Sequence, residues 1–487
     1  MARIAVHRVR PHLPPTCRCP NPVIHAERTL HWFRAPLLVW HLGISALMLG
    51  GGCYTRHSFS TSDAGDAGSP DGNGSIEPLE ARYTGIDEFT AQWGNFQDAT
   101  QLGDGIALLA ETAAWGAGGS DALVVATGPN GDLLWDITLG GTEDERVRAL
   151  VNTHDGALLV AGGTKSFPDS QGRENGWIVR LNIDGNIKWQ VSLGTDNFDW
   201  LNAIVQTPDS GFLGGGYTID GAWAVKIDSN GSPIWSKQYS SNRVIATVIP
   251  TSQDTYILAG DVGANAWIAE VDVNGEIIRE TAVGVPNGLN HTFLKANQTA
   301  SGYAVAGTVL VDFGSYSNHQ AWFVKLSGEL TVEADTIYRS EGSGRLNDLI
   351  TLSNDQWLAI GNISGACLLW IDTDADLIRY RELNFSGNFF RQRLLSRSNN
   401  HVLIADSNYQ DLPDTIQYGL LISEFGVEIP PQQLWCTATS EVSEVDKVRN
   451  TAINSTVTTT VQSLSLESTP ISLTVTRENL TATQSCN

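Results

Sequence analysis

The chain has few charged residues and is poor in several residue types. Of its 487 residues, 17% are charged, two are Met and six are Cys, and 30 Lys and Arg stand against 53 Asp and Glu. Low charge beside 48 Gly and 15 Trp excludes coiled coil, collagen and wholesale disorder, and favours many short strands and turns. The scarcity of basic residues also excludes a nucleic acid partner, because an acidic surface repels phosphates and has no basic stripe to release counterions.

Sequence motifs of common catalytic sites are missing as well. Neither Gly-x-Ser-x-Gly nor His-Glu-x-x-His occurs, and the histidines after Cys53 are scattered along the chain. The glycines of "FLGGGYT" lie inside a strand pattern and not before a helix, so they do not form a phosphate cradle. We therefore expect no catalytic residue, no metal and no cofactor.

Two shorter patterns need a separate interpretation. Asp372, Asp374 and Asp376 match the start of a calcium loop, but Leu377 stands where the loop requires Gly. This segment lies where other parts of the chain have a hairpin turn, so we expect a solvated turn. Cys367 lies in an expected strand without a nearby base, which favours a buried, inert thiol.

The N-terminus has the plan of a signal peptide. Basic residues precede the apolar stretch 35–52, which ends in small residues and Cys53. Its interruption by His41 and glycines makes a permanent membrane span the poorer interpretation. The stretch resembles a bacterial lipoprotein signal, which implies lipidation of Cys53, with cleavage alone as the alternative. Residues 1–53 are thus an expected leader and signal peptide, and the Ser-, Gly- and Asp-rich residues 54–84 an expected flexible tether.

Two strand patterns each occur seven times, and they interleave. The first is a turn followed by a short apolar strand, as in "DGALLVAGGT", and the second is a strand such as "GWIVRL". The first pattern starts at Asp104, Asp155, Ser210, Asp254, Ser301, Asp355 and Asn400, and the second at Ala122, Gly176, Ala222, Ala266, Ala321, Cys367 and Gly419.

Turn residues connect the second pattern to a further strand. Asp-Gly and Asn-Gly pairs, as in "NIDGN" at 182–186 and "DSNG" at 228–231, supply the positive φ angles that tight hairpins require. Trp135, Trp189 and Trp235 follow at a constant spacing, which indicates hairpins of fixed length. We interpret the recurring tryptophans as packing between repeats.

The repeats predict an all-β propeller. One more strand precedes each first pattern, as in 146–153, so each unit holds four short strands in about 44 to 55 residues, the size of a blade. Seven units predict a closed, seven-bladed β-propeller of four-stranded blades over residues 85–430, because closure removes exposed strand edges. The segment "EFTAQWGNF" (88–96) is expected to complete the seventh blade from the other terminus.

These repeats resemble those of secreted bacterial seven-bladed β-propeller (SBBP-like) proteins. The resemblance rests on Trp-x-Val-Lys-Leu, Asp-x-Asn-Gly-x-Ile-x-Trp and Asp-Gly-x-x-x-Val-Ala-Gly-x-Thr, and covers roughly residues 86–430. It implies an exported, non-catalytic binding or scaffold module of the cell envelope, attached to the membrane through its lipid only. Its partner would be a polysaccharide, a peptide or an envelope protein, and Tyr54 after the cysteine favours the outer membrane.

Composition changes again in residues 431–487. This part is rich in Thr and Ser with alternating aliphatic residues, and is bracketed by Cys436 and Cys486. The alternation predicts short strands in a small separate β-rich domain. A disulfide between the two cysteines is expected, because an exported segment with so few large apolar residues meets oxidising conditions and lacks a strong core.

Loop lengths suggest where a ligand binds. The loops from the second to the third strand are longer in blades one, two, five and seven than in the others, and loops on a rigid scaffold commonly carry function. Aromatic residues rimmed by acids suit a sugar or a cationic partner, and the alternative is that these rings fold back over the blade ends. The expected ligand-binding residues are Trp115, Phe167, Phe198, Trp200, Phe313, Tyr316 and Tyr409.

A second functional class stays open. The "IDGNIKW" turns resemble the repeats of quinone-dependent dehydrogenases, which would make the chain a propeller enzyme. That interpretation requires basic and carboxylate residues around the channel together with a bound metal, and the sequence shows no convergent set of this kind.

Overall fold

The computed structural model describes residues 80–84, residues 94–426 with short gaps, and five short segments between 446 and 484. Every regular element of this described part is a β-strand, and all strand pairs are antiparallel. Cys53, Phe313, Tyr316, Cys436 and Cys486 lie outside the described residues.

The strands from β2 to β25 form six blades, each made of four consecutive strands. The first three blades comprise β2 (Gly94–Leu102), β3 (Gly105–Thr112), β4 (Asp121–Thr127) and β5 (Leu133–Leu139); β6 (Glu145–Asn152), β7 (Leu158–Thr164), β8 (Asn175–Leu181) and β9 (Ile187–Gly194); and β10 (Asp199–Gln206), β11 (Phe212–Thr218), β12 (Gly221–Ile227) and β13 (Pro233–Tyr239). The next three comprise β14 (Arg243–Pro250), β15 (Tyr256–Val262), β16 (Asn265–Val271) and β17 (Ile277–Gly284); β18 (Gly288–Gln298), β19 (Gly302–Asp312), β20 (Ser317–Ser327) and β21 (Val332–Arg339); and β22 (Gly344–Thr351), β23 (Trp357–Ile363), β24 (Ala366–Ile371) and β25 (Leu377–Glu382).

A further sheet differs from these blades because it combines both ends of the chain. Three of its strands are consecutive: β26 (Gln392–Arg397), β27 (His401–Leu412) and β28 (Thr415–Gly426). The next strand is β1 (Glu80–Thr84), which pairs with β28. We call it the composite sheet. The predicted seven four-stranded blades are therefore corrected to six blades of consecutive strands and one composite sheet.

The prediction that residues 88–96 complete the seventh blade was wrong. Within 88–96, the described residues from Gly94 onward begin β2, the inner strand of the first blade, whereas β1 supplies the strand of the composite sheet. β1 lies in the expected tether. A strand at the outer part of a sheet needs backbone hydrogen bonds more than apolar side chains, so its short polar sequence gave no strand signal.

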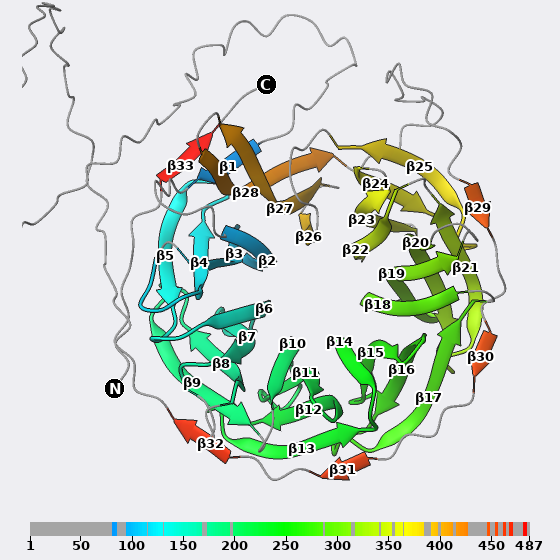
Figure 1. Cartoon of the computed structure of the whole chain (residues 1–487), viewed down its shortest axis with the longest axis horizontal. Coiled ribbons are helices and arrows are strands. Elements are labelled where there is room, and N and C mark those ends of the chain that lie inside the picture. Colours follow the sequence, from blue (N-terminus) through cyan, green and yellow to red (C-terminus); the bar gives the residue numbers. More distant parts are fainter. Residues whose placement is uncertain are drawn as a thin grey trace, which may run out of the picture.

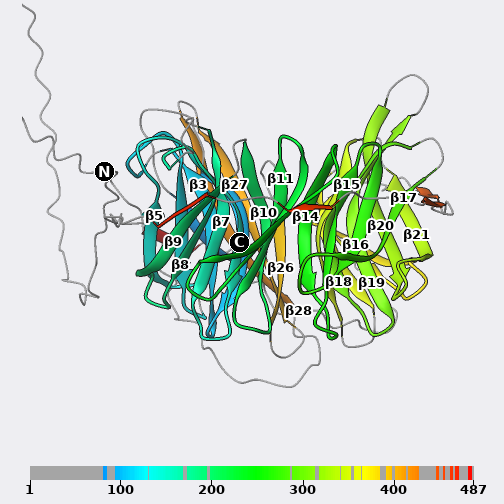
Figure 2. The ribbon, with the colours of Figure 1, turned by 90° about the horizontal axis from the view of Figure 1, so that it is seen from below.

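The sheets stand around a central channel (Figure 1). The first strand of each sheet, from β2 to β26, lies innermost, and the later strands lie progressively further out. A buried apolar cluster lies between each pair of neighbouring sheets, and the composite sheet contributes to the clusters on both of its sides, through Leu403 with Phe96 and through Leu394 with Leu358. Seen from the side, the strands run between two opposite faces (Figure 2).

These faces differ in the connections they carry. The hairpin face holds the turns after the first and third strands, and the loop face holds the connections from the second to the third strand and from one blade to the next. In the turn between β8 and β9, Gly185 donates its N–H to the carbonyl of Asn182 at 2.9 Å and has φ of 73°. A turn closed by this hydrogen bond, with a glycine in the left-handed region, matches the Asx-Gly pattern, so the hairpin prediction is confirmed.

Two columns of tryptophans connect strands and blades. In the third strands, Trp177, Trp223 and Trp267 are fully buried, and Trp223 Nε1 donates to Ser236 Oγ at 2.8 Å. In the fourth strands, Trp135 and Trp189 donate to carbonyls in the next blade, at 2.8 Å to Ile183 and 3.1 Å to Ser229. The expectation that the tryptophans pack between repeats is confirmed.

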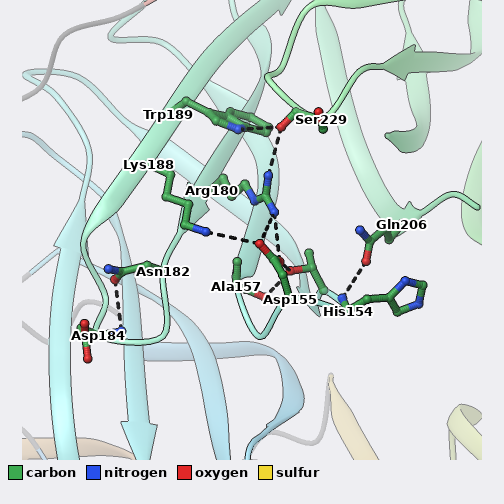
Figure 3. A network of polar contacts seen from close by, with 11 residues as sticks. His154, Asp155, Ala157, Arg180, Asn182, Asp184, Lys188, Trp189, Gln206 and Ser229 are labelled. Atoms are coloured by element: carbon green, nitrogen blue, oxygen red, sulfur yellow. Dashed lines mark hydrogen bonds and ion pairs between the residues drawn. The ribbon is translucent and has the colours of Figure 1, made fainter. Parts of the chain in front are cut away.

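A network of polar side chains on the hairpin face also connects the second blade to the third (Figure 3). Arg180 Nη2 lies 2.9 Å from Asp155 Oδ2, and Lys188 Nζ lies 3.3 Å from the same oxygen. Arg180 Nη1 also donates to the carbonyl of Ser229 at 3.0 Å in the next blade. Hydrogen bonding from Thr153, together with Arg180, lowers the pKa of Asp155. Arg180 thus joins the second blade to the third, whereas Lys188 pairs within the second blade.

The last strands lie along the outside of the ring. In chain order β29 (Asp446–Val448), β30 (Ile453–Ser455), β31 (Val461–Ser463), β32 (Glu467–Pro470) and β33 (Thr481–Gln484) pair with β21, β17, β13, β9 and β1. They are seen at the rim in Figure 1. We call these five strands the outer strap.

The expected separate C-terminal domain is corrected by this arrangement. Alternating Thr, Val and Ile do form short strands, but each described strand of the outer strap pairs with a propeller sheet and not with another strap strand. The physical reason is that the outermost blade strands have open edges, whose unpaired N–H and C=O groups are a template for a further strand.

Candidate functional site at one end of the channel

The channel encloses a cavity of about 310 Å³. All seven inner strands, β2, β6, β10, β14, β18, β22 and β26, contribute to its wall. The lining is mixed, because apolar residues such as Ile204 and Leu294 alternate with the charged residues Asp98, Lys295 and Arg393.

Charges inside the cavity are largely paired. Asp98 accepts hydrogen bonds from the backbone N–H groups of Ala99 and Leu150, both at 2.9 Å, and from Arg393 Nε at 2.5 Å. It thereby connects the first blade to the second blade and to the composite sheet. Asp348 has a similar role, since it accepts from the N–H groups of Leu349 at 2.9 Å and Leu394 at 3.0 Å. The nearest ammonium, Lys295 Nζ, lies 3.9 Å away.

Positive charge accumulates where the inner strands begin, at the loop-face end of the channel. Arg146 and Arg148 belong to β6, Arg393 to β26, and Arg391 immediately precedes β26. We call these four residues the arginine cluster. Arg148 Nη1 donates to Gln97 Oε1 at 2.7 Å and to Glu111 Oε1 at 3.2 Å.

The cluster has more positive than negative charge around Arg391. Burial, together with repulsion from Arg148 and Arg393, lowers the pKa of Arg391 to about 9, against the attraction of Asp98 and Glu111. Burial also raises the pKa of Glu111, although its arginine neighbours oppose this. Other carboxylates act on the rest of the cluster, since Asp348 attracts Arg393, and Glu174 attracts Arg146.

An aromatic cluster adjoins these arginines. It consists of Phe198, Trp200 and Tyr217, whose ring centroids lie 6.0 to 6.4 Å apart. The guanidinium carbons of Arg148 and Arg146 lie 5.2 and 5.7 Å from the centroid of the Trp200 ring. These are cation–π distances. Phe198 and Tyr217 are half-buried, whereas Trp200 is 4% exposed.

Two polar groups near this cluster lack hydrogen-bond partners within the described part of the chain. They are the indole N–H of Trp200 and both carboxylate oxygens of Glu174, which is 3% exposed. Burial raises the pKa of Glu174, opposed by Lys165 and Arg146. A buried polar group without a partner costs about 1–3 kcal/mol. The end of the channel therefore holds donor and acceptor capacity that the described residues do not use.

The expected ligand-binding residues are found in different places. Phe198 and Trp200 lie together, as described, but burial of Trp200 beneath two arginines corrects its expected role as an exposed ring. Trp115 and Phe167 are half-buried and pack against blade cores, as the fold-back alternative predicts. Tyr409 lies in β27, opposite Tyr418.

Loop length had different consequences in different blades. In the fifth blade, part of the extra length extends β19 and β20 to eleven residues each, and β27 and β28 of the composite sheet have twelve residues each. In the first two blades the extra residues lie between strands, at 113–120 and 165–174.

The arginine cluster was missed by the sequence analysis. A signal existed, because Arg-x-Arg occurs in both "RVRALVNT" and "RQRLLSR" at the start of inner strands. What the sequence does not reveal is that β6 and β26 both lie next to β2, one on each side. The prediction that no convergent basic set exists around the channel was wrong.

The aspartate segment 372–376 and Cys367 have the structural roles expected from the sequence, a turn and a buried thiol. Asp372 Oδ1 accepts from the N–H groups of Asp374 and Asp376 at 3.0 and 2.8 Å, so this segment is a hairpin turn. Burial raises the pKa of Cys367 to about 12, as expected for an inert thiol. Among the described residues, no group of three or more His, Cys, Asp or Glu has the arrangement of a metal site. The same residues include no helix that could span a membrane.

Comparison with known proteins finds similarity among solved structures only. No family model matches the chain, and no curated protein matches it. Among solved structures, the Neurospora crassa Pan2 WD40 domain is 10% identical, covering 70% of this chain and 90% of that domain with a TM-score of 0.45. The β-propeller domain of the trilobed protease from Pyrococcus furiosus is 9% identical, with coverages of 72% and 99% and a TM-score of 0.37.

A third similar structure is a protein of unknown function from Bacteroides caccae. It is 17% identical, with coverages of 51% and 82% and a TM-score of 0.33. The chain's own topology shows an all-β propeller with four-stranded antiparallel blades.

Proposed function

We propose that this chain is an exported, lipid-anchored propeller of the SBBP-like type that binds a ligand at the loop-face end of its channel without catalysing a reaction. Export and lipidation at Cys53 rest on the signal-peptide pattern, and placement at the outer membrane rests on Tyr54. The observation that carries the binding function is the convergence of the arginine and aromatic clusters at one end of the channel.

The proposal includes a ring of seven blades, with the composite sheet as the seventh. This is supported by the apolar clusters on both sides of the composite sheet and by the participation of β26 in the channel wall. In such a ring, Arg391 and Arg393 reach the first blade from one side while Arg146 and Arg148 reach it from the other. The site therefore depends on ring closure.

The non-catalytic assignment is supported by the state of the reactive groups. Cys367 is buried with a raised pKa, so its thiolate is not populated at neutral pH. Asp98 and Asp348 are engaged by backbone N–H groups and cannot easily serve as bases. The tightly held inner strands are typical of a rigid binding scaffold.

The alternative, a quinone-dependent dehydrogenase, is favoured by one observation: the channel does hold basic and carboxylate residues. The residues fit a calcium ion and a quinone poorly, however, because Asp98 is paired with Arg393 and Asp348 accepts two backbone hydrogen bonds. Absorbance of the purified protein above 300 nm, with and without added quinone and calcium, separates the two classes. A stable new band after removal of free quinone would favour the enzyme.

A glycan and peptide array tests the binding function. We expect the purified protein to capture a ligand, and the double variant F198A/Y217A to lose that capture while its melting temperature changes by only a few degrees. The control K188A removes a cation from the hairpin face (Figure 3) and should capture normally. Equal loss in both variants, or retained capture in F198A/Y217A, would contradict this location. Trp200 is left intact because replacing a buried Trp by Ala costs about 3–5 kcal/mol.

A further inference from the structure

The outer edge of the first blade lies between two sheets that carry strap strands. Five of the seven sheets end in a strand of the outer strap, whereas β5 and β25 each pair on one side only among the described strands. The first blade packs between the second blade and the composite sheet, as the two apolar clusters around it show. β32 and β33, which are consecutive in the chain, lie on those two neighbours (Figure 1).

The outer strap advances by a constant number of residues from blade to blade. An equivalent position in each fourth strand is the buried residue that pairs with the small residue before the third-strand Trp. From the fifth blade to the second, this residue and its strap partner are Tyr338 with Lys447, Val283 with Asn454, Tyr239 with Val461 and Leu193 with Ser468. The strap thus moves seven residues per blade. In the first blade this position is Leu139, opposite Ala122, and the next step of the strap reaches Val475.

The connection from β32 to β33 has the length that a further strap strand requires. It comprises residues 471–480, which lie outside the described residues as a connection between two described strands. The other connections within the strap have three to five residues, at 449–452, 456–460 and 464–466. Ten residues suffice for two such connections with a three-residue strand between them.

The sequence of this connection also favours a strand. Residues 471–476 read Ile-Ser-Leu-Thr-Val-Thr, so aliphatic residues alternate with small hydroxyl residues, and β-branched residues are frequent. An outer strand that lacks a neighbour presents a row of N–H and C=O groups as a template for such a segment.

We infer that the outer edge of β5 is the docking site of residues 474–476, which pair with it in antiparallel orientation and place Val475 opposite Leu139. The strap then covers the first blade as it covers the second. A second copy of the chain is the less favourable occupant, because β32 and β33 hold both ends of the segment beside β5 and so raise its local concentration there. This inference is independent of the ligand site at the end of the channel.

Paired cysteine substitutions test the register. Directly opposed residues of an antiparallel pair have Cα atoms about 4.5–5.5 Å apart, which suits a disulfide. T138C/T476C should therefore form an intramolecular disulfide, detected by mass spectrometry of the unreduced digest. S192C/T469C is the matched positive control, because Ser192 and Thr469 are opposed in the structure. T138C/S472C is the out-of-register control and should give at most about a tenth of the T138C/T476C cross-link.

Hydrogen exchange tests the same contact without added cysteines. Proline lacks the backbone N–H, and two successive N–H groups of a strand point to opposite sides, so a pair of prolines removes one bond to the neighbouring strand. V475P/T476P should therefore speed exchange in β5 at least about threefold and leave β13 unchanged. V461P/Q462P, which alters β31 on β13, should have the reverse effect.

Several results would overturn the inference. Cross-linking of T138C/T476C between molecules would assign the edge of β5 to a second copy. Absence of this disulfide while S192C/T469C forms, an equal yield from T138C/S472C, or unchanged exchange of β5 in V475P/T476P would each contradict the docking of residues 474–476. Failure of S192C/T469C to cross-link would remove the pairing on which the seven-residue step depends. Ligand capture on the array tests the proposed function separately.

Discussion

Replacing Asp98 by Asn should destabilise the ring at its closing point. The Asp98 carboxylate accepts from the N–H groups of Ala99 and Leu150 and from Arg393 Nε at 2.5 Å. It therefore connects the first blade to the second and to the composite sheet. Neutralising it leaves the largely buried Arg393 without its directly paired carboxylate, and breaking such a pair from one side costs about 3–5 kcal/mol.

Asp348 provides the matched control. Its carboxylate accepts two equivalent backbone hydrogen bonds, but its closest ion pair is with Lys295 Nζ at 3.9 Å, and Arg393, which attracts it, pairs directly with Asp98 instead. D348N should therefore lose mainly hydrogen-bond energy, about 1–3 kcal/mol. The expected difference between the two variants, about 2 kcal/mol, measures the ion pair at the seam between first blade and composite sheet.

Calorimetry can resolve this difference. With an unfolding entropy of about 2.1 cal/mol/K per residue, a propeller of roughly 350 residues loses about 1.4 °C in melting temperature for each kcal/mol. We expect D98N to melt about 5 °C below the unmodified protein and D348N about 3 °C below. R393M in the D98N background should recover part of the loss, because it removes the unpaired charge. A D98N effect no larger than that of D348N would refute the reasoning.

Four further outcomes are expected. Burial and the adjacent Glu145 raise the pKa of Asp121 to about 7, above its unfolded value near 4; the folded state then binds the proton more tightly, so this group's contribution to stability falls as pH rises from about 4 to 7. D121N should remove that slope and raise the melting temperature at pH 8 by the equivalent of at least about 1 kcal/mol, and an unchanged pH profile would contradict the assignment. Ending the chain at residue 428, which removes the outer strap, should leave the far-UV spectrum largely unchanged but cause self-association by light scattering, because the edges of β9, β13, β17 and β21 become open; a monodisperse monomer would argue against a protective role. C53A or globomycin should leave unprocessed or soluble precursor, whereas an unchanged membrane fraction would exclude lipidation. Mass spectrometry of an unreduced digest should show Cys436 joined to Cys486, a loop closure worth roughly 4 kcal/mol in the chain-entropy model, and two free thiols would remove that prediction.

The blade repeats were predictable because two strong local signals coincide. Apolar strand patterns fixed the second and third strands, and Asx-Gly turns such as that at Gly185 fixed the hairpins between third and fourth strands. Each signal lies within about ten residues of sequence. Its recurrence in every repeat makes the prediction for one repeat support the prediction for the others. The packing role of Trp189 and Trp223 followed from the same repetition.

Elements stabilised by a neighbour's edge were not predictable in the same way. β1 and the outer strap strands have three to five residues, too few for an apolar pattern to be visible. They gain backbone hydrogen bonds from sheets that are already formed. Their position therefore depends on where other sheets have open edges, which no local pattern contains.

The candidate site was partly predictable for a related reason. Loop lengths predicted that the ligand-binding site lies on the loop face. This prediction included Phe198 and Trp200 among the expected ligand-binding residues. Burial of Trp200 depends on Arg146 and Arg148 from the preceding blade, and the Arg393–Asp98 pair joins residues 295 positions apart. Such contacts are set by the order of sheets around the ring.

The most direct test of the account is a co-crystal structure of the protein with a ligand identified on the array. We predict ligand density at the loop-face end of the channel, in contact with Arg146 or Arg148 and with the ring of Phe198 or Tyr217. Density on the hairpin face near Lys188, or along the outer strap, with the channel end unchanged, would contradict the central claim.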